Sequence, residues 1–134
     1  MEKTTVLLGF GSEFSGTLHC ENTKIEIGTK PGQAKPYDLL LGALGSCLYA
    51  TFAGIAKKMK LVFDRAEIKI TGEKREEIPT TLKKVLISFV FYEVENSSGF
   101  QRAVDLAAKY CSVHSTIEKV AEVTINIEIE SEKE

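Results

Sequence analysis

Three cysteines carry the most reactive side chains of this sequence, and they lie far apart at positions 20, 47 and 111. A thiolate is a nucleophile, and two cysteines that meet in a fold can act as an attacking and a resolving pair. An odd number of widely spaced cysteines is not the disulfide framework of a small secreted protein. We therefore expect a cytoplasmic protein, in which a cysteine pair is more often catalytic or redox-sensing than structural.

The three cysteines differ in their surroundings along the chain. By residue statistics alone Cys47, in the middle of an apolar run, is a small buried core residue. Cys111 lies in the segment YCSVHST, at an expected junction of helices, where unpaired backbone N–H groups favour a thiolate. Nothing in their spacing requires that the two meet. Cys20 follows His19 in an expected strand, and we interpret it as an ordinary strand residue.

The histidines do not complete a metal site. Cys111 and His114 are three residues apart and could share a helical face, but two ligands fall short of the usual three or four for zinc. The sequence has no serine-nucleophile motif, phosphate-cradling glycine loop or dinucleotide fingerprint. We expect no metal and no cofactor, and we expect His114 to have a surface or capping role.

Length and charge favour one small globular domain. The chain has 134 residues, with 17 basic and 19 acidic side chains, a net charge of −2 and a pI near 5.8. We expect a single domain over residues 1–134, and no nucleic-acid partner because no basic stripe is present. One uncharged run of eighteen residues is at the lower limit of a membrane span. Glycines and polar residues dilute that run, so we interpret it as a core helix and expect no membrane partner.

That uncharged run predicts the dominant element of the fold. Residues 39–56 carry no charge, and Asp38 and Lys57 bound them with the charges that suit a helix N-terminus and C-terminus. A helix that is apolar all round should be buried on nearly every side. It would be about 31 Å long at 1.5 Å per residue, which is difficult to bury within one small chain. We therefore expect an obligate homodimer formed mainly through this helix, where Gly42 and Gly45 permit close approach of backbones.

The remaining elements are expected to be strands and two shorter helices. The strands cover residues 4–10, 14–20, 24–28, 65–74, 82–94 and 122–130. Both faces of the 82–94 strand are apolar, so we expect both to be covered. Ser97 or Ser98 is expected to cap a helix, and Ser112 to start a shorter one. Their inward residues are expected to be Val104, Ala107, Ala108 and Cys111, then Ile117 and Val120. The fold class is α+β, with a mostly antiparallel sheet around a long central apolar helix.

Two segments carry a resemblance to a known family. PYDLLLGALGSC, with Cys47 eleven residues after Pro36, resembles the first signature of the OsmC/Ohr family of osmotically induced and organic-hydroperoxide-resistance proteins. YCSVHSTI, followed by EVTINIEIE, resembles the second, and the order of elements is similar along essentially the whole chain. The resemblance implies an intertwined OsmC-like homodimer with active sites at the subunit interface. It also implies that organic hydroperoxides are reduced by a Cys47 peroxidatic thiolate, with Cys111 resolving and a dithiol as the reductant.

The chain departs from the peroxidases of that family at two charged positions. They have a glutamate directly after the proline, whereas this chain has Tyr37, with Asp38 one residue later. On an ideal helix Asp38 lies about 180° around and about 13 Å along from Cys47, so it could approach only the partner's Cys47. They also have an arginine in the N-terminal strands, whereas the first arginine here is Arg65 and the earlier cations are lysines such as Lys35. In these respects the pattern is more similar to the YhfA-like branch.

Two hypotheses follow for the function. The first is a hydroperoxide reductase, with Cys47 and Cys111 catalytic and with Asp38, Tyr37 and Lys35 as electrostatic partners. The second is a non-catalytic dimeric module that binds a small apolar ligand or a partner and retains both cysteines for packing. The cysteine pair favours the first hypothesis, which we adopt, and the missing arginine favours the second. We expect slow turnover, because burial of Cys47 raises its thiol pKa and no arginine offsets that effect.

Overall fold

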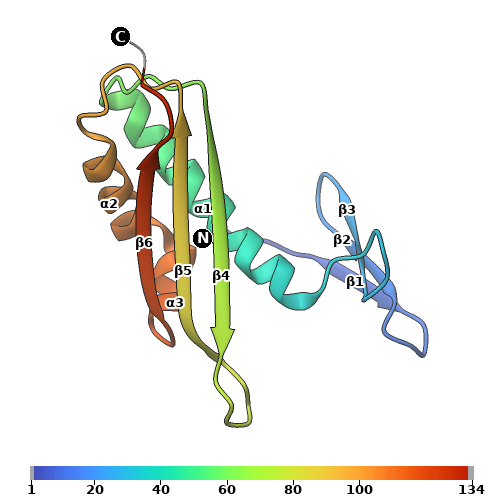
Figure 1. Cartoon of the computed structure of the whole chain (residues 1–134). Helices are drawn as coiled ribbons and strands as arrows, with labels where there is room; N and C mark the ends of the chain where they lie inside the picture. Colours follow the sequence, from blue (N-terminus) through green and yellow to red (C-terminus); the bar gives the residue numbers. More distant parts are fainter. Residues whose placement is uncertain (1, 133–134) are drawn as a thin grey trace. The chain divides into compact units, whose positions relative to one another are not determined.

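The computed structural model describes residues 2–132, which form two compact units divided between Gly42 and Ala43. A long helix, α1 (Pro36–Lys58), begins in the first unit and continues into the second (Figure 1). It begins at Pro36, two residues earlier than expected, because proline suits the first turn of a helix, where its missing N–H has no partner to lose. The expectation of one domain over the whole chain stays a prediction.

The first unit contains a small antiparallel sheet. Its strands are β1 (Leu7–Phe10), β2 (Gly16–His19) and β3 (Lys24–Ile27), paired in the order β1-β2-β3. Each strand is shorter than the sequence pattern predicts. Cys20 lies just after β2, where its backbone N–H donates to the Thr23 carbonyl oxygen at 2.7 Å and closes the turn into β3.

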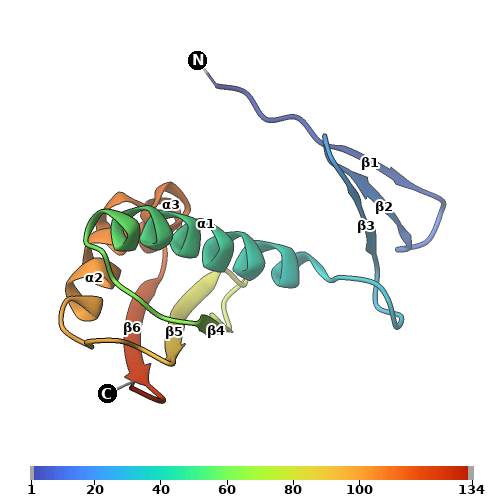
Figure 2. The same cartoon turned by 90° about the horizontal axis from the view of Figure 1, so that it is seen from above.

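The second unit has three helical segments on one face of a second sheet. Its strands are β4 (Arg65–Lys74), β5 (Leu82–Tyr92) and β6 (Glu122–Ile129), in the order β4-β5-β6. Figure 2 shows α1, α2 (Phe100–Tyr110) and α3 (Ser112–Glu118) on the same side of this sheet. Strand β4 is antiparallel to β5, whereas β6 is parallel to β5 because α2 and α3 form the crossover between them. The α+β class is confirmed, and the single sheet is corrected to two sheets of three strands.

Aromatic side chains form the core of the second unit. Phe52 of α1 is fully buried, with its ring centroid 5.1 Å from that of Phe91, and Phe91 lies 4.9 Å from Phe100 of α2. The buried side chains of α1 follow a spacing of four and form one stripe, Leu44, Leu48, Phe52 and Ala56, with Gly45 buried beside it. These contacts hold α1 and α2 against β5, which fixes the middle of α1, where Cys47 lies, and the end of α2, where Cys111 lies.

Helix α1 is buried along one stripe within this chain, not on nearly every side as the sequence predicts. It is long and apolar enough to cross a membrane by length and composition, and 28% of its most apolar window is buried. It is therefore partly a core helix. Gly45 is the close-packed glycine, since a Cβ there would lie 2.8 Å from the Ile70 side chain of β4. At Gly42 and Gly54 an added Cβ would meet open space.

Three local predictions are wrong, each for a physical reason. The outer face of β5 is not covered by a second layer, and Leu86 is 43% exposed there. Helix α2 has no side-chain cap, because Gly99 adopts φ 93° and starts the helix in place of Ser97 or Ser98. Val120 is 51% exposed, since α3 ends before it and the chain turns into β6.

Candidate functional site

Cys47 and Cys111 meet in the second unit. Their sulfur atoms are 3.1 Å apart, although 64 positions separate them in the sequence. A disulfide has a sulfur–sulfur distance of about 2.05 Å, so roughly 1 Å of movement would join them. Both are free thiols in this structure, Cys47 half-buried and Cys111 fully buried. The sequence pattern alone left this meeting open.

The backbone explains where each sulfur lies. Cys111 has extended dihedral angles, φ −74° and ψ 117°, so it ends α2 and turns the chain directly into α3. Its N–H donates to the Ala107 carbonyl oxygen at 2.8 Å, and its sulfur accepts the N–H of His114 at 3.4 Å. Cys47 lies on α1 beside the buried stripe, one residue before Leu48. The packing of α1 beside the α2–α3 junction therefore brings the two sulfurs together.

The electrostatic surroundings differ sharply between the two thiols. The pKa of Cys47 is lowered, first by a hydrogen bond from the Val113 backbone and then by the Cys111 thiol, against an opposing effect of burial. The pKa of Cys111 is raised, mainly by burial and also by its contact with Cys47. The charge of a shared thiolate therefore belongs on Cys47, and the Cys111 S–H donates to it.

These directions correct two expectations. Burial was expected to raise the pKa of Cys47, and backbone N–H groups were expected to favour a thiolate at Cys111. Hydrogen bonds from backbone N–H groups lower the pKa of Cys47 despite its burial, whereas at Cys111 the larger effect of burial outweighs the hydrogen bonds from the His114 and Val113 N–H groups. Among the described residues, hydrogen bonds lower the Cys47 pKa, and no cationic side chain contributes to that lowering.

Two further side chains of α3 belong to this neighbourhood. The Ser112 hydroxyl oxygen lies 4.0 Å from the Cys47 sulfur, and Ser112 was expected only to begin a helix. His114 is buried, with 8% of its surface exposed, so the expectation of a surface role is wrong. Its Nδ1 lies 3.6 Å from Glu118 Oε2 and has no hydrogen-bond partner within residues 2–132. Across residues 2–132, no group of three or more potential ligands from His, Cys, Asp and Glu could hold a metal.

The residues expected to assist the thiols electrostatically belong to the first unit. Asp38 accepts a hydrogen bond from the Lys35 backbone N–H at 2.9 Å, which holds the first turn of α1. Tyr37 is half-buried and lies between them in the sequence. The effect of Lys35, Tyr37 and Asp38 on Cys47 stays a prediction.

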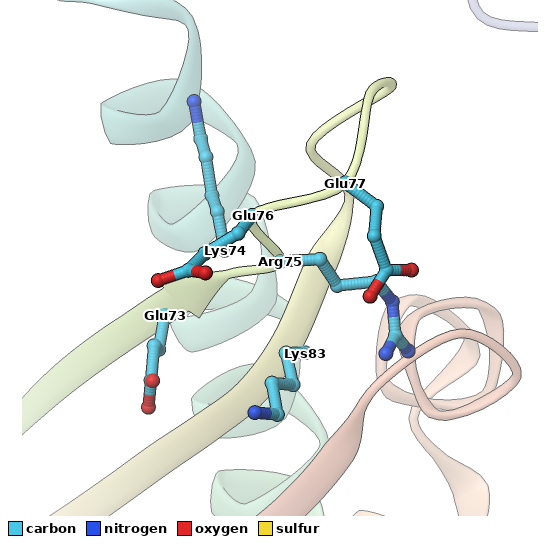
Figure 3. Close-up of a pocket in the computed structure, with 6 residues that line it drawn as sticks. All are labelled: Glu73, Lys74, Arg75, Glu76, Glu77 and Lys83. Carbon is cyan, nitrogen blue, oxygen red and sulfur yellow. The ribbon is translucent and has the colours of Figure 1, made fainter.

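A charged hollow of about 190 Å³ lies at the β4–β5 turn (Figure 3). Its lining is three acidic and three basic residues: Glu73, Lys74, Arg75, Glu76, Glu77 and Lys83. In Figure 3 the Arg75 side chain points toward the segment between α3 and β6, and its guanidinium donates to the Val120 carbonyl oxygen at 2.7 Å. The hollow has no dominant charge and no cysteine or histidine in its lining, so we assign it a structural role.

Residues 28–127 match the protein family described as OsmC-like protein. Protein YhfA of Escherichia coli strain K12 is 32% identical over 96 residues, which are 70% of this chain and 72% of YhfA. A crystal structure of a hypothetical protein from Aquifex aeolicus VF5 is similar over all of both chains, with 27% identity and a TM-score of 0.88.

A more distant similarity extends to a protein named for hydroperoxides. The organic hydroperoxide resistance protein OhrB of Bacillus subtilis is 15% identical and has a TM-score of 0.70. The similarity covers 95% of this chain and 98% of that one. At this level of identity the likeness is one of fold alone.

Proposed function

Because the chain belongs to the family of OsmC-like proteins, we propose that it reduces organic hydroperoxides through a peroxidatic Cys47 and a resolving Cys111. Such an activity would serve defence against oxidative stress. The observation that carries the proposal is the 3.1 Å separation of the two sulfurs. The accessible sulfur is the one with the lowered pKa, and the enclosed sulfur is the one with the raised pKa. A peroxidatic and a resolving thiol need this asymmetry.

In the first step the Cys47 thiolate attacks the terminal oxygen of the hydroperoxide. A sulfur–oxygen bond forms and the oxygen–oxygen bond breaks, so Cys47 becomes a sulfenic acid and the hydroperoxide leaves as an alkoxide. The alkoxide takes a proton from water and is released as an alcohol. The half-exposed position of Cys47 gives the hydroperoxide access, and the lowered pKa favours the thiolate form that attacks it.

In the second step Cys111 attacks the oxidised sulfur. The sulfenic oxygen leaves as water with the thiol proton of Cys111, and a Cys47–Cys111 disulfide forms. An external dithiol then reduces the disulfide by thiol–disulfide exchange and restores both thiols. The sulfurs are close enough that the step requires little movement of α1 or of the α2–α3 junction.

The proposal includes a cytoplasmic homodimer. The face of α1 outside its buried stripe is apolar and is exposed or only half-buried within one chain, and Leu40 is one of its exposed residues. A second copy packed on that face would remove it from water, and burial of apolar surface is worth about 25 cal/mol per Å². The dimer would also offer Asp38, Tyr37 and Lys35 a route to the partner's Cys47.

The test is consumption of tert-butyl hydroperoxide by the reduced protein, with dithiothreitol as the dithiol. Cys47→Ser should lose the activity, whereas Cys20→Ser, a matched control in the first unit, should keep it. Without dithiothreitol the wild type should end as a disulfide, and Cys111→Ser should end as a sulfenic acid that dimedone traps. If Cys47→Ser consumes the hydroperoxide as quickly as the wild type, the proposal is wrong.

The second candidate is the non-catalytic dimeric module. Among the described residues, hydrogen bonds and not a cationic side chain lower the Cys47 pKa, which favours this candidate because a nearby cation would stabilise the thiolate further. In that case the uncovered face of α1 serves assembly or the binding of an apolar ligand, and both thiols are packing residues. Full retention of self-association with no hydroperoxide consumption by the wild type would select this candidate.

A further inference from the structure

Ser112 places an exposed hydroxyl beside the Cys47 sulfur. It is the first residue of α3 and directly follows Cys111, so the geometry that brings the two sulfurs together also fixes Ser112. Its hydroxyl oxygen lies 4.0 Å from Cys47 Sγ. Among residues 2–132 this is the only hydrogen-bonding contact of the hydroxyl, while the Ser112 carbonyl oxygen accepts the hydroxyl of Thr116 at 3.1 Å. The Ser112 hydroxyl is thus available to a molecule that approaches Cys47.

The distance between the Ser112 hydroxyl oxygen and Cys47 Sγ is long for a hydrogen bond to the sulfur, but it suits a hydrogen bond to an oxygen atom that lies beside the sulfur. An O–H···O hydrogen bond spans roughly 2.5–3.0 Å, and the 4.0 Å contact leaves space for a substrate oxygen beside both atoms. During attack on a hydroperoxide, negative charge moves from the sulfur to the oxygen that departs. A hydroxyl hydrogen rotates freely to its best acceptor, so the Ser112 O–H can follow the charge from sulfur to oxygen. Because this hydrogen bond is stronger in the transition state than in the bound substrate, it lowers the activation barrier for cleavage of the oxygen–oxygen bond.

We propose that Ser112 is a catalytic residue whose hydroxyl donates a hydrogen bond to the departing alkoxide oxygen of an organic hydroperoxide. The inference rests on the proposed function. Cys47 is oxidised to the sulfenic acid as the oxygen–oxygen bond breaks, and the hydroperoxide is reduced to the alkoxide. Water, which reaches the exposed Ser112, supplies the proton that turns the alkoxide into an alcohol, and Ser112 keeps its own proton. The Ser112 hydroxyl would thus stabilise the departing oxygen by a hydrogen bond, without a cationic side chain.

The experiment compares two reactions of the same sulfur in the same variants. One is oxidation of Cys47 by tert-butyl hydroperoxide, and the other is its alkylation by iodoacetamide, which produces no alkoxide. Both rate constants are taken from the pH-independent plateau above the thiol pKa, so a change in thiolate fraction does not enter. Ser112→Ala and Ser112→Gly remove the hydroxyl, and Ser112→Thr retains it. Thr116→Ala is the matched control, because it removes another hydroxyl from the same helix.

We expect both hydroxyl-free variants to oxidise about 10- to 100-fold more slowly than the wild type, the range for a hydrogen bond to a charged group. Their plateau rate constants for alkylation should stay within about twofold of the wild-type value, which corresponds to a difference in activation free energy of under about 1 kcal/mol. Ser112→Thr and Thr116→Ala should follow the wild type in both reactions. Equal losses in oxidation and alkylation, or oxidation of Ser112→Ala at the wild-type rate, would overturn the assignment while leaving the proposed function intact. A wild-type Cys47 that hydroperoxide does not oxidise would overturn both.

Discussion

Closing the Cys47–Cys111 disulfide should stabilise the folded chain. The cross-link would join residues 64 positions apart, and a loop of that size restricts the unfolded chain by about 4 kcal/mol in the chain-entropy treatment. Movement of the Cys111 sulfur toward Cys47 would weaken its contact with the His114 N–H, now 3.4 Å long, at a cost of about 1 kcal/mol. The expected net gain is about 3 kcal/mol. For a chain of this size that corresponds to an increase in Tm of about 10 °C.

The assay is thermal unfolding of the reduced and oxidised forms at one protein concentration. One equivalent of tert-butyl hydroperoxide generates the oxidised form, and peptide mapping under non-reducing conditions identifies the bridge. The concentration is held constant because self-association shifts Tm by mass action. Cys47→Ser treated in the same way is the control, and its Tm should not respond to the hydroperoxide. Cys20→Ser should respond as the wild type does.

Two results would refute this reasoning. The first is an oxidised protein with the mapped Cys47–Cys111 bridge but a lower Tm than the reduced form. That would mean that strain in the cross-linked folded state costs more than the restriction of the unfolded chain contributes. The two sulfurs could then not be joined with the small movement that their 3.1 Å separation indicates. The second is a bridge that includes Cys20, which would contradict the pairing itself.

Three further substitutions test the core, the uncovered helix face and the thiol pair. Phe52→Ala should lower the free energy of unfolding by about 3–5 kcal/mol, measured in urea, because it empties the centre of the aromatic core. Gly54→Ala should stabilise the monomer by about 1 kcal/mol through helix propensity and should weaken self-association, measured by analytical ultracentrifugation, because its added methyl group projects from an open face. Cys111→Ala should move the pH midpoint of Cys47 alkylation upward, because Cys47 loses an S–H donor that lowers its pKa.

Each of these predictions has an outcome that contradicts it. If Phe52→Ala lowers the free energy of unfolding by less than about 1 kcal/mol, Phe52 is not at the centre of the core. Unchanged self-association of Gly54→Ala would remove that face of α1 from the dimer. An unchanged alkylation midpoint in Cys111→Ala would mean that the thiols do not interact.

The lowered pKa of Cys47 also contributes to the stability of the folded chain. This contribution is complete above the ordinary pKa of 9.0 and is lost as the pH falls through the pKa of the folded state.

Local pattern predicted the secondary structure well where one face of an element is buried. Strand β4 runs over Arg65–Lys74 as its alternation predicts, and β6 begins at Glu122 as expected. The sequence pattern did not predict burial or helix starts where contacts between distant parts of the chain determine them. Leu86 is as apolar as its buried neighbours but lies on the bare face of the sheet. The start of α2 depends on the backbone conformation of Gly99, which composition does not reveal.

The candidate site was predictable in part. Both cysteines stand out by residue type, and the family resemblance led us to expect that they meet. Their pKa directions were not predictable, because they depend on how deeply the core encloses each sulfur and on which sulfur donates the hydrogen bond between them. The burial of His114 was missed for the same reason, since a short polar segment gives no periodicity that reveals its inner face. Ser112 had no sequence signal beyond its place next to Cys111.

The α2–α3 junction also has a consequence during synthesis of the chain. A ribosome adds about 5–20 residues per second, so Cys111 follows Cys47 after about 3–13 s, given the 64 positions between them. During that interval Cys47 lacks the Val113 N–H and the Cys111 S–H that lower its pKa. Its thiol therefore stays mostly protonated at neutral pH and reacts slowly with oxidants, which protects it from irreversible oxidation on the nascent chain. The segment that lowers the Cys47 pKa also carries the Cys111 sulfur, so both arrive at the same stage of synthesis.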